Sequence, residues 1–423
     1  MKIVSAQTTY ISGKLKAPFG FKGGYVSDIW QTVCKVETQK TLGVGVGVQS
    51  VLWSDANVFS AYGEEKGNCL MYQISQKAVE LLQGREGDTP IDLIDGIYAE
   101  LFAYAKSLIS ENLRETFVKN ALVCVDNALW QAYGKECNEQ DIMRVIPQEY
   151  VGALSVRHQK LCNIPLITYG VQREEIGKFL QNGTVLLKIK IGNDNGKSKE
   201  EMLAWDKKRL AEIHQIASKY KTEYTTNGNI LYYLDANGRY DNVNRLQSLL
   251  EYAQEIGAME NIVLLEEPFD EENKIDVSAL PVRIVADESV HAVKDVEERI
   301  ALGYQAIALK PIAKTLSETL KILKVASEHN IVCFCADLTV NPLLVEWNKN
   351  IASRIPTLPE MKIGILESNG EQNYVNWTEM QTYSPSYKET FSLCENGVYT
   401  LNEKFFNTSG GIFQDSNYYK NLF

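Results

Sequence analysis

The sequence has few histidines, no long apolar run and no excess of positive charge. No apolar run reaches the roughly 18–20 residues of a membrane span, so we expect no membrane partner. The 43 lysines and arginines are outnumbered by 54 aspartates and glutamates, which gives a net charge of −11. Because phosphate backbones are bound by clustered lysine and arginine, we expect no nucleic-acid partner either. The histidines have no metal-binding spacing and offer little basis for a zinc site. They are His158, His214, His291 and His329.

The eight cysteines are scattered, and only Cys333 and Cys335 are close in sequence. Their i, i+2 spacing in a strand-like run disfavours a disulfide and suits buried thiols. The first ten residues lack the sustained apolar segment of a signal peptide. Together these features predict a reducing, cytoplasmic setting.

The 423 residues are enough for a (β/α) barrel of about 250 residues and one further domain. Residues 1–150 read as strands followed by helices, which predicts a separate α+β domain. Expected strands are 2–10, 25–38 and 43–50, and expected helices are 70–83, 91–110 and 115–134. The run GVGVGVQS in the third strand indicates a closely approached backbone. The segments 17–25 and 53–57 either cover a pocket or form ordinary surface turns.

From about residue 163 strands and helices alternate, which indicates parallel strands. About eight such units favour a closed barrel rather than an open doubly wound sheet, and we expect this barrel to span residues 151–370. Expected strands are 165–170, 185–191, 230–235, 262–266, 282–286, 305–310, 331–335 and 361–366. Expected helices are 172–181, 198–220, 241–257, 274–279, 291–302, 315–328, 341–353 and 376–380. The aromatic and polar segment 371–423 is expected to pack back on the first domain.

Charged residues end several of these strands, where barrel enzymes place their chemistry. In VLLKIK, alternation directs Lys188 and Lys190 into the barrel and Ile189 and Ile191 toward the helices. Two ammonium groups this close should lower each other's pKa, which makes a lysine a usable base near neutral pH. The alternative is a pair of lysines that reach out to water.

Three acidic residues, Asp235, Glu266 and Asp287, end consecutive strands. Converging carboxylates repel one another unless a cation lies among them, and oxygen-only ligands favour Mg²⁺. Capping of the following helices would explain any one of the three, but explains all three poorly. By strand parity, Glu267 and Glu288 should point elsewhere and act from a second layer. Asn237 shares the direction of Asp235 and could orient a ligand or a water molecule.

Lys310 ends the sixth strand, across the barrel from the second. Ala306 and Ala308 share its direction and leave room beneath the site. Lysines on opposite walls suit proton transfer at both faces of one carbon, with a metal ion stabilising the charge on an adjacent carboxylate. Asp337 and Glu367 end the seventh and eighth strands and could bind a substrate ammonium or hydroxyl group or act as an acid. Helix capping by Asp337 is an equally open alternative.

The motifs KIK, LDAN, EEP, ADES and ALKP, in this order and spacing, resemble the enolase superfamily and its muconate lactonizing enzyme-like subgroup. The resemblance covers essentially the whole chain and implies an α+β capping domain, a modified (β/α) TIM-type barrel and symmetric homo-oligomers. It assigns Asp235, Glu266 and Asp287 as Mg²⁺ ligands. It assigns Lys190 and Lys310 as acid/base residues, with Lys188 as the electrostatic partner of Lys190.

Some family patterns are missing. No His-Asp pair ends the sixth and seventh strands, which argues against the mandelate racemase-like branch. Dipeptide epimerases carry an Asp-x-Asp near the eighth strand, and this sequence lacks it. A Gly pair often follows the sixth-strand lysine, but Pro311–Lys314 stands there instead. The run Leu309-Lys310-Pro311 is similar to 2-succinylbenzoate synthases.

The expected function is abstraction of the proton α to the carboxylate of a small substrate, through an enediolate intermediate. Two lysines favour a racemase or epimerase of an amino-acid derivative or dipeptide. The alternatives on the same site are a cycloisomerase or dehydratase, similar to 2-succinylbenzoate synthase or to the acid-sugar dehydratases. A Schiff-base lysine aldolase and a catalytically silent binding protein are the alternatives from other classes.

Overall fold

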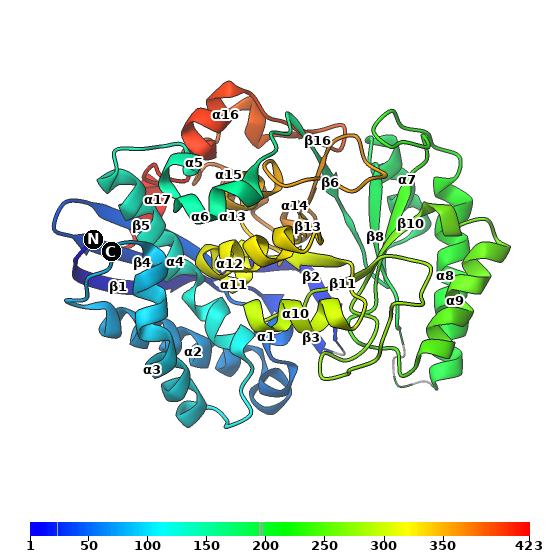
Figure 1. Cartoon of the computed structure of the whole chain (residues 1–423), viewed down its shortest axis with the longest axis horizontal. Coiled ribbons are helices and arrows are strands. Elements are labelled where there is room, and N and C mark those ends of the chain that lie inside the picture. The colour runs from blue at the N-terminus through cyan, green and yellow to red at the C-terminus, as the bar shows by residue number, and fades with distance from the viewer. Residues whose placement is uncertain (23, 194–195, 197) are drawn as a thin grey trace.

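The computed structural model describes residues 1–423 except 23, 194–195 and 197. Its N-terminal part contains an antiparallel sheet of order β1-β4-β5 and a separate two-stranded hairpin (Figure 1). The sheet consists of β1 (Ile3–Ile11), β4 (Gln31–Thr38) and β5 (Leu42–Val48). The hairpin consists of β2 (Lys14–Phe21) and β3 (Gly24–Asp28). The hairpin includes most of segment 17–25, which is predicted to be a loop. Residue 23 of this segment lies outside the described residues.

Helices follow this sheet along the chain. The long ones are α2 (Ala56–Leu82), α3 (Pro90–Leu108) and α4 (Glu115–Glu136), and the short ones are α1 (Val51–Ser54), α5 (Ile142–Val145) and α6 (Gln148–Val151). Two of the long ones, α2 and α4, pack directly on the sheet. The predicted close approach in GVGVGVQS is confirmed, because a Cβ at Gly43 would lie 2.0 Å from the carbonyl oxygen of Ala128 in α4. Only glycine allows the helix to reach the strand here.

The second part is the predicted barrel. Its strands are β6 (Lys160–Ile164), β7 (Leu166–Ile167), β8 (Leu186–Lys190), β9 (Leu231–Asp235), β10 (Ile262–Glu266), β11 (Ile284–Ala286), β12 (Ala306–Leu309), β13 (Val332–Cys335) and β14 (Gly364–Glu367). Each strand from β8 to β14 pairs in parallel with the next, β14 pairs with β6, and β7 pairs with β8. Only Pro165 separates β6 from β7, and proline has no amide hydrogen for the ladder. The two ends of the parallel sheet thus meet at Pro165, and the sheet curls back on itself there.

Helices follow most strands on the outside of the barrel (Figure 1). They are α7 (Arg173–Gln181), α8 (Lys199–Ala217), α9 (Val243–Glu255), α10 (Val293–Ala301), α11 (Pro311–Lys314), α12 (Leu316–Glu328), α13 (Pro342–Ala352), α14 (Gly370–Asn373) and α15 (Trp377–Gln381).

The predicted helix 274–279 is wrong, because this segment consists of turns and irregular backbone. The side chains of Asp270, Asn273 and Asp276 each accept a hydrogen bond from the amide two residues further on. Such local bonds satisfy the backbone without a helix.

Alternation along the strands divides the barrel into an interior and a helix-facing side, as predicted. Ala306 and Ala308 belong to the interior cluster, together with Tyr233 and Phe334. Ile189 belongs to the layer that packs against the helices. The polar residues at the carboxyl ends of the strands lie above this apolar interior.

The C-terminal segment contacts both parts of the molecule. Its short strands β15 (Cys394–Glu395) and β16 (Val398–Thr400) extend the barrel sheet, with β16 antiparallel to β6. The helices α16 (Glu403–Thr408) and α17 (Asn417–Lys420) follow. The hydroxyl of Tyr419 donates to Gln31 Oε1 of β4 at 2.9 Å, and both termini lie beside the N-terminal sheet (Figure 1). The domain boundaries at 150 and 370 stay predictions.

Two findings bear on the compositional expectations. All eight cysteines, which fall within the described residues, are free thiols. In the same part of the chain, no helix is both long enough and apolar enough to cross a membrane.

Candidate active site at the carboxyl ends of the barrel strands

The strand register brings the predicted charged residues to one level. Lys190 pairs with Asp235 across β8 and β9, and Asp235 pairs with Glu266 across β9 and β10. Above them lies a small, partly open pocket. Its lining includes every metal ligand and lysine predicted from the sequence, and side chains of the hairpin and α1 close it from above. The closing side chains are Phe19, Phe21, Val26 and Trp53.

One wall of the pocket consists of two lysines against an aspartate. Asp235 Oδ2 lies 3.1 Å from Lys188 Nζ and 2.6 Å from Lys190 Nζ. Lys190 also donates to Asn237 Oδ1 at 2.5 Å, so Asn237 orients this lysine. Burial raises the pKa of Asp235, but Lys190 and Lys188 outweigh burial and leave the pKa below its ordinary value.

The opposite wall repeats this arrangement with Asp287. Lys310 Nζ donates to Asp287 Oδ2, and Lys314 Nζ lies 3.4 Å from Oδ1 and donates to the backbone carbonyl at 2.7 Å. The indole of Trp53, from α1, donates to Oδ2 at 3.3 Å, and its ring centroid lies 4.5 Å from Lys310 Nζ. Burial raises the pKa of Asp287, but Lys310 and Lys314 lower it further than burial raises it.

Lys188 lies between the two walls. Its Nζ is 3.2 Å from Glu266 Oε2 and 3.1 Å from Glu367 Oε2, in addition to its contact with Asp235. Burial lowers the pKa of Lys188, but these carboxylates outweigh burial and raise the pKa well above its ordinary value. The expected depression of the Lys188 pKa by Lys190 is therefore wrong, because the acidic groups dominate its surroundings. Burial raises the pKa of Glu266 to about 7.

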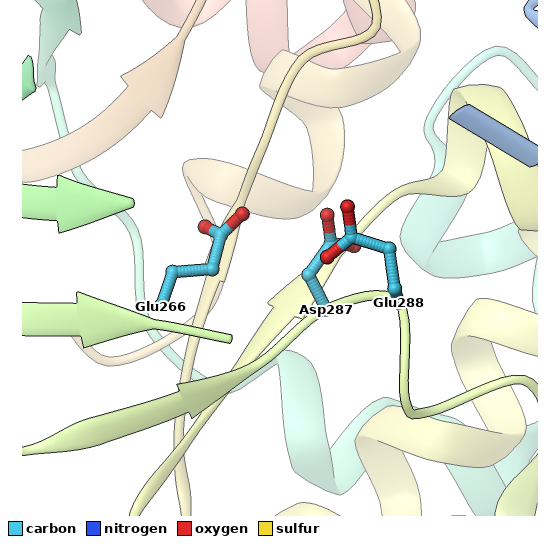
Figure 2. Close-up of side chains that lie close together, drawn as sticks. All are labelled: Glu266, Asp287 and Glu288. Atoms are coloured by element: carbon cyan, nitrogen blue, oxygen red, sulfur yellow. The ribbon is translucent and has the colours of Figure 1, made fainter. Parts of the chain in front are cut away.

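Three carboxylates form a compact cluster at the second wall. Glu266, Asp287 and Glu288 each place one oxygen within 4.8 Å of the others, and Figure 2 shows the Asp287 and Glu288 groups side by side, across from Glu266. Asp235 lies outside this group and is linked to Glu266 through Lys188. The parity argument for Glu288 is wrong, because β11 ends at Ala286 and alternation does not extend beyond it.

Glu267, the other residue that parity directed elsewhere, points away from the cluster. Its Oε2 accepts from the amides of Asp287 and Ser289 at 2.8 and 3.1 Å. Glu267 therefore fixes the backbone that carries Asp287 and Glu288.

Comparison with known proteins identifies the barrel. Residues 173–363 match the family model described as enolase C-terminal domain-like. These residues form an enolase C-terminal domain-like barrel. The match covers a little less than half of the chain and shows that this part of the barrel is similar to enolase C-terminal domains.

Solved structures share the fold of the whole chain. An N-succinyl Arg/Lys racemase from Bacillus cereus is 17% identical, with 98% of each chain covered and a TM-score of 0.67. A dipeptide epimerase from Enterococcus faecalis, solved with Mg and L-Leu-L-Tyr, is 18% identical, with 87% of this chain and 90% of that chain covered and a TM-score of 0.61. An L-Ala-D/L-Glu epimerase from Bacillus subtilis is 18% identical, with 89% and 92% covered and a TM-score of 0.62. A search of curated proteins found no match.

In this enolase-like barrel, the seventh and eighth strands add two buried acids to the pocket. Glu367 Oε2 accepts from the amide of Asp337 at 3.1 Å, and Asp337 Oδ2 accepts from the amide of Asn369 at 2.7 Å. Burial, followed by the nearby Glu367, raises the pKa of Asp337 to about 7. The alternative of helix capping by Asp337 is wrong, because Asn341 caps α13, the next helix.

The sequence reasoning missed several residues of the site. Lys314 lies in a helix of one turn, where strand alternation gives no guidance. Trp53 lies in a predicted covering loop, but nothing in the sequence linked it to Asp287. Lys22, from the hairpin, lies 3.2 Å from Glu288 Oε1 and was not singled out.

Proposed function

We propose that this protein is a Mg²⁺-dependent enzyme that abstracts the proton α to the carboxylate of a small substrate. The reaction would pass through an enediolate intermediate and would racemise or epimerise an amino-acid derivative or dipeptide. One observation carries this proposal: Lys190 and Lys310, each paired with an aspartate, end the second and sixth strands on opposite walls of one pocket. The racemase and epimerases of similar fold support it.

The donor atoms around the pocket fit a hard divalent cation. Glu266, Asp287 and Glu288 are buried, and each offers a carboxylate oxygen within 4.8 Å of the others. Asp235, Glu266 and Asp287 would hold Mg²⁺, and the bound ion would stabilise negative charge on the substrate carboxylate.

The protein side chains would then divide the proton transfers. Lys190 removes or returns the proton at one face of the α-carbon, and Lys310 does so at the other face. Lys188, held among three carboxylates, supplies positive charge near Lys190. Asp337 and Glu367 would bind a substrate ammonium or hydroxyl group. Trp53 and the hairpin phenylalanines would exclude water from the reacting carbon.

A cycloisomerase is the second candidate, with a chemistry similar to that of 2-succinylbenzoate synthase. The aromatic and aliphatic side chains that close the pocket favour it, because they suit a substrate with an uncharged, apolar body: Phe19, Phe21, Val26, Ile29, Leu166 and Leu338. The Schiff-base aldolase is disfavoured. A Schiff-base lysine does not need the buried carboxylates that converge in this pocket.

The test is exchange of the α-proton in heavy water with Mg²⁺, followed by proton NMR on dipeptides, N-acyl amino acids and sugar acids. For a racemase or epimerase, Lys190→Ala and Lys310→Ala should each lose exchange from a different enantiomer or epimer, by about 10³-fold. For a cycloisomerase, one of the two variants should keep exchange. Exchange that survives in both variants, or that a chelator leaves unchanged, would show that the assigned roles are wrong.

A further inference from the structure

Glu288 has one carboxylate oxygen fully engaged and one without a partner. Its Oε1 accepts from Asn237 Nδ2 at 3.0 Å and lies 3.2 Å from Lys22 Nζ. Its Oε2 is buried and finds no hydrogen-bond partner among the described residues. The side chain is only 4% exposed. Leaving a buried carboxylate oxygen without a hydrogen-bond partner costs free energy, so we expect a ligand at this atom.

The carboxylate of Glu288 faces two other acids. Glu266, Asp287 and Glu288 each offer one oxygen within 4.8 Å of the others, and Figure 2 shows the three groups converging from the ends of β10 and β11. Three converging carboxylates repel one another unless a positive charge lies among them. The Lys22 contact is made on Oε1, the oxygen already shared with Asn237.

The backbone holds Glu288 in this position from two sides. Glu267 Oε2 accepts from the amides of Asp287 and Ser289, and from the Ser289 hydroxyl at 3.0 Å. Lys314 Nζ donates to the carbonyl of Asp287 at 2.7 Å. Both clamping side chains are buried. Because the turn after β11 is fixed at its amides and its carbonyl, two successive residues can face the same cluster.

We propose that Glu288 Oε2 is a further oxygen donor to the divalent cation, beside Asp235, Glu266 and Asp287. This inference rests on the proposed function, because it concerns the same cation. The ligand class is a hard divalent ion, Mg²⁺ or Mn²⁺, which prefers carboxylate oxygen. Through its Oε1, Glu288 also joins the cation site to the capping hairpin at Lys22 and to Asn237, which orients Lys190.

The test uses Mn²⁺ binding to the full-length protein, measured by calorimetry and by electron paramagnetic resonance. Glu288→Gln removes the charge with little change of shape and should weaken Mn²⁺ binding about 10- to 100-fold. At saturating Mn²⁺ its spectrum should differ from that of the wild type, a signature that a purely structural role would not produce. Glu260→Gln makes the same charge change at an exposed position and should leave affinity and spectrum unchanged.

Two further variants separate the possible failures. Glu266→Gln should lose Mn²⁺ binding more completely than Glu288→Gln. If Glu266→Gln loses binding while Glu288→Gln keeps wild-type affinity and spectrum, the inference on Glu288 is overturned and the proposed function stands. If the wild type itself does not bind Mn²⁺, both fail. Glu288→Asp retains the charge on a shorter side chain and should give intermediate affinity, which provides the same readout if Glu288→Gln does not fold.

Discussion

The two walls of the pocket reach the same charge arrangement from different local structures. On the first wall, Lys188 and Lys190 contact Asp235, and both lysines come from strand β8. On the second wall, the two lysines contact Asp287 from outside any strand. Lys310 follows β12, and Lys314 lies one helical turn later in α11.

Helical rather than strand geometry brings the second pair together. The amide of Lys314 donates to the carbonyl of Lys310 at 2.8 Å, and residues four apart on a helix lie on the same face. The walls also differ in their cover, since Trp53 lies over Lys310 whereas Asn237 orients Lys190. Both walls therefore place two cations around one aspartate, although the backbone that supplies these cations differs between them.

Beyond the two acid/base lysines, the largest expected effect comes from removing Lys314, the second cation of the second wall. Lys314→Met leaves Asp287 Oδ1 and the Asp287 carbonyl without their buried donor. We expect kcat for α-proton exchange to fall by about 10- to 100-fold, because the carboxylate and the turn lose their orientation. Lys314→Arg should recover part of this loss.

Lys324→Met is a matched control, since it removes a lysine of the neighbouring helix that is far more exposed. Equal activity of Lys314→Met and Lys324→Met would break the equivalence of the two walls. A change in KM alone would assign Lys314 to substrate binding instead.

The sequence predicted the parts of the site that depend on strand alternation. Three of them end their strands, namely Lys190, Asp235 and Glu266, and Lys188 shares the inward face of β8 with Lys190. The structure places all four at the pocket. The barrel class and the close contact of the glycine-rich strand followed from similarly local patterns.

The missed features depend on where elements end and on contacts between distant segments. Glu288 lies in the cluster because β11 ends at Ala286 and strand alternation does not extend to position 288. The pKa of Lys188 rose because Glu266 and Glu367 approach it from other strands. Trp53 meets Asp287 across the interface between the capping domain and the barrel, and no spacing in the sequence encodes that contact.

Trp53 contacts Lys310 and Asp287 and should therefore affect the second wall only. Trp53→Leu removes both the ring over Lys310 and the donor to Asp287, and we expect about a 10-fold loss of exchange. Trp53→Phe keeps a ring and should lose about 3-fold. Exchange of each substrate enantiomer, followed separately, should show the loss at the Lys310 face. Equal losses at both faces would mean that Trp53 acts on substrate binding as a whole.

Asp337 lies in the same pocket but has no lysine partner among the described residues, and this sets it apart from the two wall aspartates. Lysines lower the pKa of Asp235 and Asp287, whereas burial and Glu367 raise the pKa of Asp337 to about 7. A carboxyl group with a raised pKa holds its proton in the folded state over a range where the unfolded chain has released it. Its contribution to stability is therefore full below the ordinary value and is lost as pH rises toward about 7.

Asp337→Asn removes this ionisation, so its melting temperature relative to the wild type should increase from pH 5 to pH 8. The expected increase is on the order of 2 °C, measured by calorimetry at fixed ionic strength. Asp276→Asn is the control, because its exposed carboxylate has a lowered pKa and is ionised throughout this range. Parallel pH profiles for the wild type and Asp337→Asn would mean that Asp337 is ionised like the wall aspartates. The contrast between paired and unpaired acids in this pocket would then not hold.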